Sequence, residues 1–179
     1  MADRDKLNKQ KMIKRILTAA TLVLGFIMLV QTQAIAQKNI ERPAKCDVKQ
    51  IDEFVSKTFD AYDESKKITE DVNFIKIEGD PKTIKNSKGE ELSKETALIQ
   101  LGDLMNRAKK QNENIKTLQD LQKPAQDALK KCPITQKPKA TKALSKGGEA
   151  LNEVIKQTKA QLELIEKQMN DIKTLKDSK

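Results

Sequence analysis

Apolar side chains recur at every third or fourth position in three long stretches of this chain. That spacing places them on one face of a helix and is typical of helices that bury one side. The first face is made by Val48, Ile51, Val55, Thr58, Tyr62 and Ser65, with Phe54 and Phe59 beside it. The second is made by Ala97, Leu101, Leu104, Ala108, Gln111, Ile115, Leu118 and Gln122. The third is made by Leu151, Ile155, Thr158, Leu162, Ile165, Met169 and Ile172.

Residues that start and stop helices bound the first stretch. Asp47 can cap the helix while Gln50 reaches back to the chain before it, the pattern of a capping box. The spacing predicts a helix over residues 47–76, although residues 72–77 fit either its last turns or a short extended segment. The glycine and proline that follow end both versions. We expect residues 81–91 to form a polar loop.

Proline and glycine also shape the second and third stretches. The second helix is predicted over residues 92–131, starting near Ser93. Pro124 should bend or break it, because proline fits a first helical turn better than a helix interior. We expect a loop over residues 133–139, and Gly147-Gly148 weakens the beginning of the third helix.

Long helices joined by short connections predict an all-α fold. Neighbouring helices should run antiparallel, which gives an elongated up-down-up bundle of three helices. The sustained three-to-four spacing also predicts coiled-coil-like packing, with surplus apolar surface for a partner or for self-association.

A separate apolar run, Ile16–Val30, lies near the amino terminus behind six basic residues. As a helix it would span about 22 Å, less than the roughly 30 Å of a bilayer core. The sequence Ala34-Ile35-Ala36 then has the small-x-small pattern of a signal peptidase site. We therefore predict a signal peptide over residues 1–36 that is cleaved on export, to a periplasmic or extracellular location. The alternative is an uncleaved anchor over residues 16–36.

Cleavage leaves an extended lead, residues 37–46, and one helical domain, residues 47–179. This mature chain has 29 basic and 24 acidic residues, so its net charge is +5. Only two of the basic residues are arginines, and the aromatic residues are three Phe and one Tyr. Nucleic-acid readers use arginine forks and aromatic stacking platforms, so we expect no nucleic-acid partner. No stable membrane anchor is expected after cleavage.

The chain has two cysteines, Cys46 and Cys132. In an oxidising compartment, paired structural cysteines are the usual state, and an up-down bundle would bring these two helix ends together. The sequence therefore predicts one disulfide between them. Closing a loop of about 87 residues would stabilise the domain by on the order of 4 kcal/mol. A redox-active or metal-binding pair is the alternative, but the spacing is not C-x-x-C and no histidine completes a metal site.

Residues for catalysis are scarce in this chain. It has no histidine, so Ser-His-Asp and Cys-His catalysis cannot be assembled. Acidic clusters at Asp60, Asp63 and Glu64 and at Glu90-Glu91 fit solvated helix faces better than an active site. Gly147-Gly148 lacks the setting of a phosphate-binding loop. We expect no enzymatic activity, no cofactor and no metal.

One surface segment carries a concentrated charge. Residues 130–146 contain six lysines and no acidic residue, namely Lys130, Lys131, Lys137, Lys139, Lys142 and Lys146. Such a run can simply keep a loop solvated. It can also bind an anionic partner, such as lipid head groups, an acidic polysaccharide or an acidic protein surface, through long-range attraction that salt weakens.

These features predict an exported, non-enzymatic helical protein that works by contact, as a binding or structural module of the cell envelope. In composition and helix length it is similar to the small basic helical chaperones of the bacterial periplasm. That similarity implies a holdase-type chaperone of unfolded clients as one alternative. A helical protein that acts on membrane surfaces is another, although the mature chain has no apolar run near 18 residues and no Trp.

Overall fold

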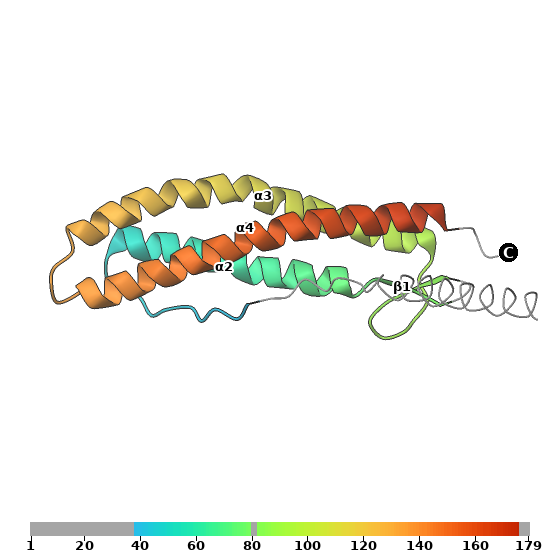
Figure 1. The fold of residues 1–179 in the computed structure, drawn as a ribbon, viewed down its shortest axis with the longest axis horizontal. Helices are drawn as coiled ribbons and strands as arrows, with labels where there is room; N and C mark the ends of the chain where they lie inside the picture. Colours follow the sequence, from blue (N-terminus) through green and yellow to red (C-terminus); the bar gives the residue numbers. More distant parts are fainter. Residues whose placement is uncertain (1–37, 80–81, 176–179) are drawn as a thin grey trace, which may run out of the picture. The chain divides into compact units, whose positions relative to one another are not determined.

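The computed structural model describes residues 38–79 and 82–175, most of which lie in three helices. These are α2 (Lys49–Asn73), α3 (Lys94–Lys130) and α4 (Lys137–Thr174), and each packs against the other two. They lie side by side, and helices that follow one another in the sequence run in opposite directions (Figure 1). The predicted helical bundle is therefore confirmed. The predicted signal peptide, residues 1–36, lies outside the described residues.

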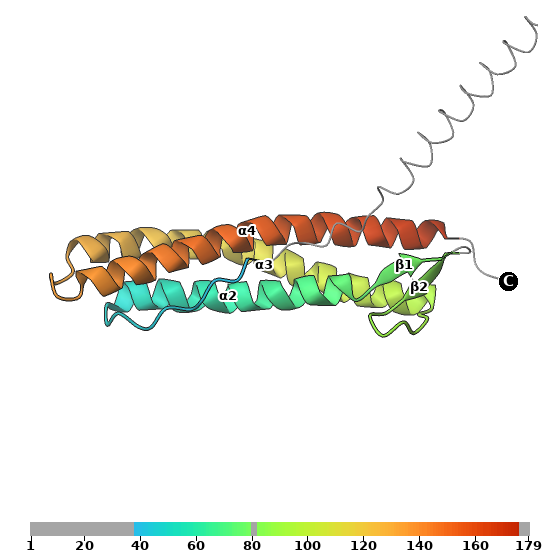
Figure 2. The ribbon, with the colours of Figure 1, turned by 60° about the horizontal axis from the view of Figure 1, so that its bottom comes forward.

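A β-hairpin follows the shortest helix. The rise of a helix makes α3 about 18 Å longer than α2. Strands β1 (Lys76–Glu78) and β2 (Thr83–Lys85) pair antiparallel at the end of α2, with Ile77 opposite Ile84. The hairpin lies beside the ends of α3 and α4 and so covers part of their extra length (Figure 2). The stretch predicted to be a polar loop thus contains a strand.

The helix starts differ in how well the sequence predicted them. The proposed cap at Asp47 is wrong, because Asp47 has a left-handed φ of 64° and α2 begins at Lys49 after Val48. No side chain caps the first N–H groups of α2. Asp52 in its first turn instead reaches back to the chain before the helix, where its carboxylate accepts from the backbone N–H groups of Cys46 at 2.8 Å and Asp47 at 3.0 Å. The helix α3 begins next to Ser93, as predicted, and Ser93 also caps it, because its Oγ accepts from the N–H of Thr96 at 3.1 Å.

Proline and glycine interrupt the long helices less than expected. The sequence predicted a bend or a break at Pro124. Pro124 lies inside α3, which continues to Lys130, so the break is absent and the helix only curves gently along its length (Figure 1). The fully buried Ala125 packs in the core beside it, and such packing can offset a lost backbone hydrogen bond. The helix α4 begins at Lys137, ten residues before Gly147, with Pro138 in its first turn. Of the predicted loop over residues 133–139, residues 133–136 are a turn and residues 137–139 already belong to α4, and the predicted helix start at the glycines is wrong.

The core has two parts, which we call the tip half and the hairpin half. The tip half contains the cysteines and the turn between α3 and α4. Its buried residues include Phe54, Val55, Phe59, Tyr62, Leu118, Ala125, Ala140, Ala143, Ala150, Leu151 and Val154. The hairpin half lies at the other end. Its buried residues are Ile68, Val72, Ile75, Ile84, Ala97, Leu101, Leu104, Ala108, Ile165 and Ile172.

Buried polar side chains lie between the two halves. Gln161 donates from Nε2 to the backbone oxygen of Ser65 at 2.7 Å and to Thr69 Oγ1 at 2.8 Å. Ser65 Oγ donates to Gln157 Oε1 at 2.8 Å, and Gln157 Nε2 donates to Glu153 at 2.9 Å. We call these five residues the polar layer. Because each hydrogen bond needs its partner opposite, the layer fixes the register of α2 against α4.

Candidate functional site

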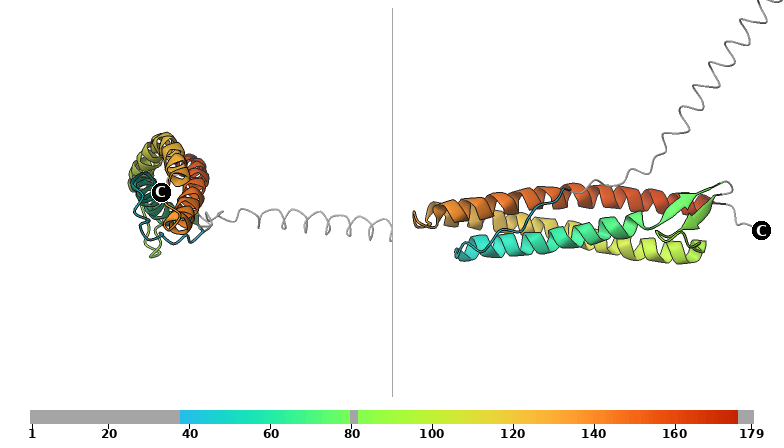
Figure 3. Two further views of the ribbon diagram at one scale, coloured as in Figure 1. Left: turned by 90° about the vertical axis from the view of Figure 1, so that its left-hand side faces the viewer. Right: turned by 90° about the horizontal axis from the view of Figure 1, so that it is seen from below.

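The six lysines of residues 130–146, which we call the lysine-rich end, lie around the turn between α3 and α4. Lys130 is the last residue of α3 and Lys131 follows it in the turn. The other four belong to α4, and two of them, Lys137 and Lys139, lie where the sequence had predicted a loop. Figure 3 looks onto this end of the bundle in its left panel. The structure thus brings the six lysines to one end, on folded elements.

Three of these lysines form ion pairs. The ammonium of Lys130 lies 2.8 Å from the carboxylate of Asp127 and lowers the pKa of that carboxyl. The ammonium of Lys139 lies 3.6 Å from the carboxylate of Asp47, and that of Lys146 lies 3.2 Å from the carboxylate of Glu149. Exposed pairs of this kind contribute little to stability. They do, however, neutralise part of the charge.

The other three lysines remain available. Lys131, Lys137 and Lys142 are exposed, and they form no ion pair with any residue that the structure describes. Residues 123–146 hold seven lysines and one acidic residue, whereas the rest of residues 37–179 holds 22 basic and 23 acidic residues. The excess positive charge of residues 37–179 is therefore confined to this end.

Close packing holds the lysine-rich end in place. Gly147 lies so near α2 that an added Cβ would be 2.7 Å from Phe54 Cε1 and 3.1 Å from Val55 Cγ2. Ala140 and Ala143, which precede it on α4, are also buried. Small residues let the two helices approach closely, so the lysines of α4 stand on a fixed support.

The predicted disulfide partners lie in the same part of the core. Cys46 is fully buried, and Cys132 is half-buried and packs against the same cluster. Both are free thiols in this structure, so the predicted bond is not seen in it. Burial raises the pKa of the Cys46 thiol, which keeps it protonated and unreactive near neutral pH. Peptide mapping of exported protein without reductant would test the disulfide, which stays a prediction.

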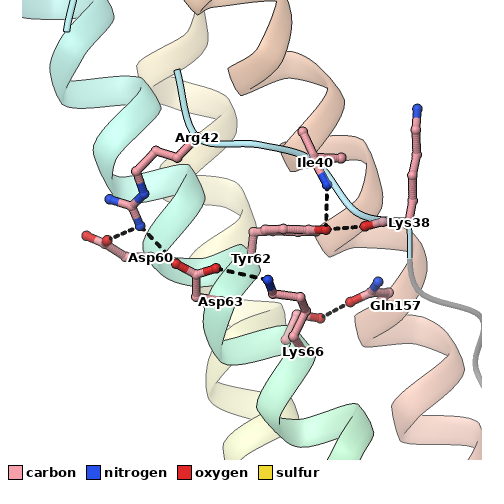
Figure 4. Close-up of polar contacts among 9 residues, drawn as sticks. Lys38, Ile40, Arg42, Asp60, Tyr62, Asp63, Lys66 and Gln157 are labelled. Atoms are coloured by element: carbon pink, nitrogen blue, oxygen red, sulfur yellow. Dashed lines mark hydrogen bonds and ion pairs between the residues drawn. The ribbon is translucent and has the colours of Figure 1, made fainter. Parts of the chain in front are cut away.

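The chain before α2 forms a strap across the tip half, over residues 38–46. Ile40 is buried, and its N–H donates to Tyr62 Oη at 3.1 Å, while the Tyr62 hydroxyl donates to the Lys38 carbonyl (Figure 4). The guanidinium of Arg42 contacts Asp60 at 2.8 Å and Asp63 at 3.1 Å. Tyr62 and Arg42 thus fasten the strap to α2.

The acidic cluster of α2 is also occupied by basic partners. Besides the two carboxylates that Arg42 holds, Glu64 lies 2.8 Å from Arg107 of α3. Arg107 also contacts Asp71 at 2.6 Å, so it links α3 to two turns of α2. These carboxylates were expected to be charges on a solvated helix face, and the structure adds arginine partners that the sequence did not predict.

Sequence reasoning missed two surface features. Ile134, in the turn between α3 and α4, is 87% exposed. A groove of about 410 Å³ lies between α3 and α4, lined by Met105, Leu162 and Met169 with Lys109, Glu166, Asn170 and Lys173 around them. The helical spacing had included Leu162 and Met169, but it could not show that they remain only partly covered.

No group of acidic residues and cysteines suited to a metal ion occurs among the described residues. Within the same part of the chain, no helix combines the length and the apolar character needed to cross a membrane. Comparison of the chain with protein-family models, with curated proteins and with solved structures found no match.

Proposed function

We propose that this chain is an exported, non-enzymatic helical protein that works by contact, as a binding or structural module of the cell envelope. Its contact surface is the lysine-rich end, and its partner is anionic. The observation that carries the proposal is the set of three exposed lysines, Lys131, Lys137 and Lys142, which have no ion-pair partner among the described residues.

Two further facts support a binding surface over a merely solvated one. Solubility requires charges that are spread over the surface, whereas here the excess charge is gathered at one end. The support under it is close-packed around Gly147, so the ammonium groups start from ordered backbone positions. Ordered groups lose less entropy when they bind a partner.

Binding to a soluble polyanion, dextran sulfate, tests the proposal. The variant with Lys131, Lys137 and Lys142 replaced by Gln should bind at least ten-fold more weakly, because each lysine contributes long-range attraction. Raising the salt concentration should likewise weaken the binding of the unmodified protein to dextran sulfate. Circular dichroism should show unchanged helicity, because none of the three side chains packs in the core.

A matched variant separates local from total charge. Replacing Lys156, Lys159 and Lys167 of α4 by Gln removes the same charge from exposed positions outside the lysine-rich end. We expect a loss of only a few-fold in this control. Equal losses in both variants would show that net charge alone governs binding, and would overturn the proposed contact surface.

The export part of the proposal is tested on the protein itself. Amino-terminal sequencing of the exported chain should begin at Gln37. An intact Met1 in the exported fraction would contradict cleavage. Affinity capture from the producing cell's envelope fraction, repeated with the triple Gln variant, would then identify partners that depend on the lysine-rich end.

The groove between α3 and α4 favours a second candidate, the holdase-type chaperone. Met105 and Met169 line it, and methionine adapts to irregular apolar partners, as unfolded chains require. Suppression of aggregation of a reduced model protein tests this candidate. A chaperone should lose that activity when both methionines are replaced by Lys, and should keep it in the triple Gln variant.

A further inference from the structure

The turn between α3 and α4 is the outermost part of the lysine-rich end. It lies farther along the bundle than the start of α2 (Figures 1 and 3). Ile134 is in this turn and is 87% exposed, the most exposed of the large apolar side chains that the structure describes. Single exposed apolar residues are common on protein surfaces and need no explanation by themselves. The surroundings of this one are unusual.

Lysines flank Ile134 on both sides. Lys130 and Lys131 precede it at the end of α3, and Lys137 follows it in the first turn of α4. The first turn of α4 contains no acidic residue, and the side chain of its N-cap residue Gln136 accepts no hydrogen bond from the helix N–H groups. The positive end of the helix dipole therefore adds to the lysine charge. An apolar side chain thus projects from a positively charged end.

We propose that this end docks on an anionic lipid surface, an inference that rests on the anionic contact proposed above. The lysines bind lipid phosphates, and Ile134 enters the boundary between head groups and acyl chains. A soluble polyanion could use the lysines but would gain nothing from an exposed aliphatic side chain. A bilayer can use both, because its charged surface lies directly above an apolar layer.

The backbone around Ile134 can bear this contact without unfolding. The N–H groups of Gln136 and Lys137 both donate to the Pro133 carbonyl, at 3.0 Å each, so the turn is internally hydrogen-bonded. Lysine suits this role because it binds phosphate as a point charge with no fixed orientation. The bundle would therefore stand on the surface by its end, with no helix inserted.

Flotation with vesicles tests the docking. The protein should bind phosphatidylglycerol–phosphatidylcholine vesicles and not pure phosphatidylcholine vesicles. Replacing Lys131, Lys137 and Lys142 by Gln should lower the partition coefficient about 100-fold, because each lysine near an anionic surface contributes roughly five-fold. The change Ile134→Ser should lower it by about ten-fold. All variants share one amino terminus, so any contribution from that segment is common to them.

Ile99→Ser is the matched control for the apolar contact. Ile99 is 60% exposed on α3, within the hairpin half and away from the lysine-rich end, so its loss should leave the partition coefficient unchanged. A tryptophan reporter gives a second measurement, since the chain contains no Trp. The emission of Ile134→Trp should shift to the blue with anionic vesicles, and that of Ile99→Trp should not.

The outcomes separate this inference from the function on which it rests. If dextran sulfate binds through the three lysines but vesicles do not, the anionic contact stands and lipid docking is wrong. Lipid docking is also wrong if Ile134→Ser binds vesicles as tightly as the unmodified protein, or if the Ile134→Trp emission does not shift. If neither dextran sulfate nor vesicles bind, both proposals fail.

Discussion

The two halves of the bundle use different side chains to solve the same packing problem. In the tip half, the large residues of α2, such as Phe54, Phe59 and Tyr62, pack against small residues of its neighbours, such as Ala140 and Gly147. In the hairpin half, branched aliphatic side chains meet from all sides, as in Ile68, Leu101 and Ile165. The close approach at Gly147 therefore makes the tip half sensitive to added volume, and both halves are sensitive to lost volume because their large side chains are fully buried.

The polar layer lies where one mode of packing changes to the other. Contacts between aliphatic side chains have no directional requirement, whereas the hydrogen bonds from Gln161 to Ser65 and Thr69 need their partners opposite and so exist in one register only. Burying such groups is favourable only when they are paired. We infer that the layer fixes the alignment of the helices and separates two units that can open independently.

The largest expected effect tests whether the halves are separate. Phe54→Ala should lower the free energy of unfolding by about 3–5 kcal/mol, and Leu101→Ala by about 2–5 kcal/mol, because both side chains are fully buried. Hydrogen exchange should speed up mainly within the half that carries the substitution.

One observation would change this comparison. If each substitution speeds exchange equally along the whole chain, the bundle unfolds as one unit and the polar layer only fixes register. Ile99→Ala is the control, because it also truncates a large apolar side chain to alanine but at a position that is 60% exposed. It should lower the free energy of unfolding by less than about 0.5 kcal/mol.

The buried faces were well predicted from the sequence. Periodicity placed Thr58, Ser65, Gln111 and Thr158 among apolar residues, and all four are buried. Helical spacing reports which face is covered whatever the residue type, so it found polar members of the core too. It could not show that Gln157 and Gln161, each one position before a member of the predicted face, would form hydrogen bonds to Ser65.

Local signals failed where tertiary contacts decide. Gly147-Gly148 lowers helix propensity, yet α4 passes through both because the glycine at 147 permits close contact with α2. Pro124 also lowers helix propensity, yet α3 continues through it to Lys130. For the candidate site, the sequence identified the six lysines but not their pairing, since Asp47 is 92 positions away from Lys139. The exposure of Ile134 also depends on the folded turn.

A smaller effect distinguishes two adjacent glycines of the tip half. Gly147→Ala should destabilise the protein by about 1–3 kcal/mol, because the new methyl group would overlap Phe54. Gly148→Ala should instead stabilise it by about 0.5–1 kcal/mol, since only Gln122 approaches that position, at 3.9 Å. Thermal unfolding of both variants measures the difference.

A double variant identifies the cause. Phe54→Leu removes the ring atoms nearest Gly147, so adding Gly147→Ala in that background should cost less than it does in the unmodified protein. The same cost in both backgrounds would mean that backbone effects govern the position. The contrast between large and small residues in the tip half would then lose its main support.

The smallest expected effect concerns the strap, which only the tip half carries. Tyr62→Phe keeps the buried ring and its edge-to-face contact with Phe59, 5.9 Å between centroids, but removes the hydroxyl that accepts from Ile40. A buried donor left without a partner costs about 1 kcal/mol or more. The strap can detach instead of the bundle unfolding, so we expect little change in melting temperature and faster exchange at the Ile40 amide.

Arg42→Gln, which loses only half-exposed ion pairs, should have a still smaller effect. If Arg42→Gln frees the strap and Tyr62→Phe does not, surface charge rather than the buried hydrogen bond fastens it.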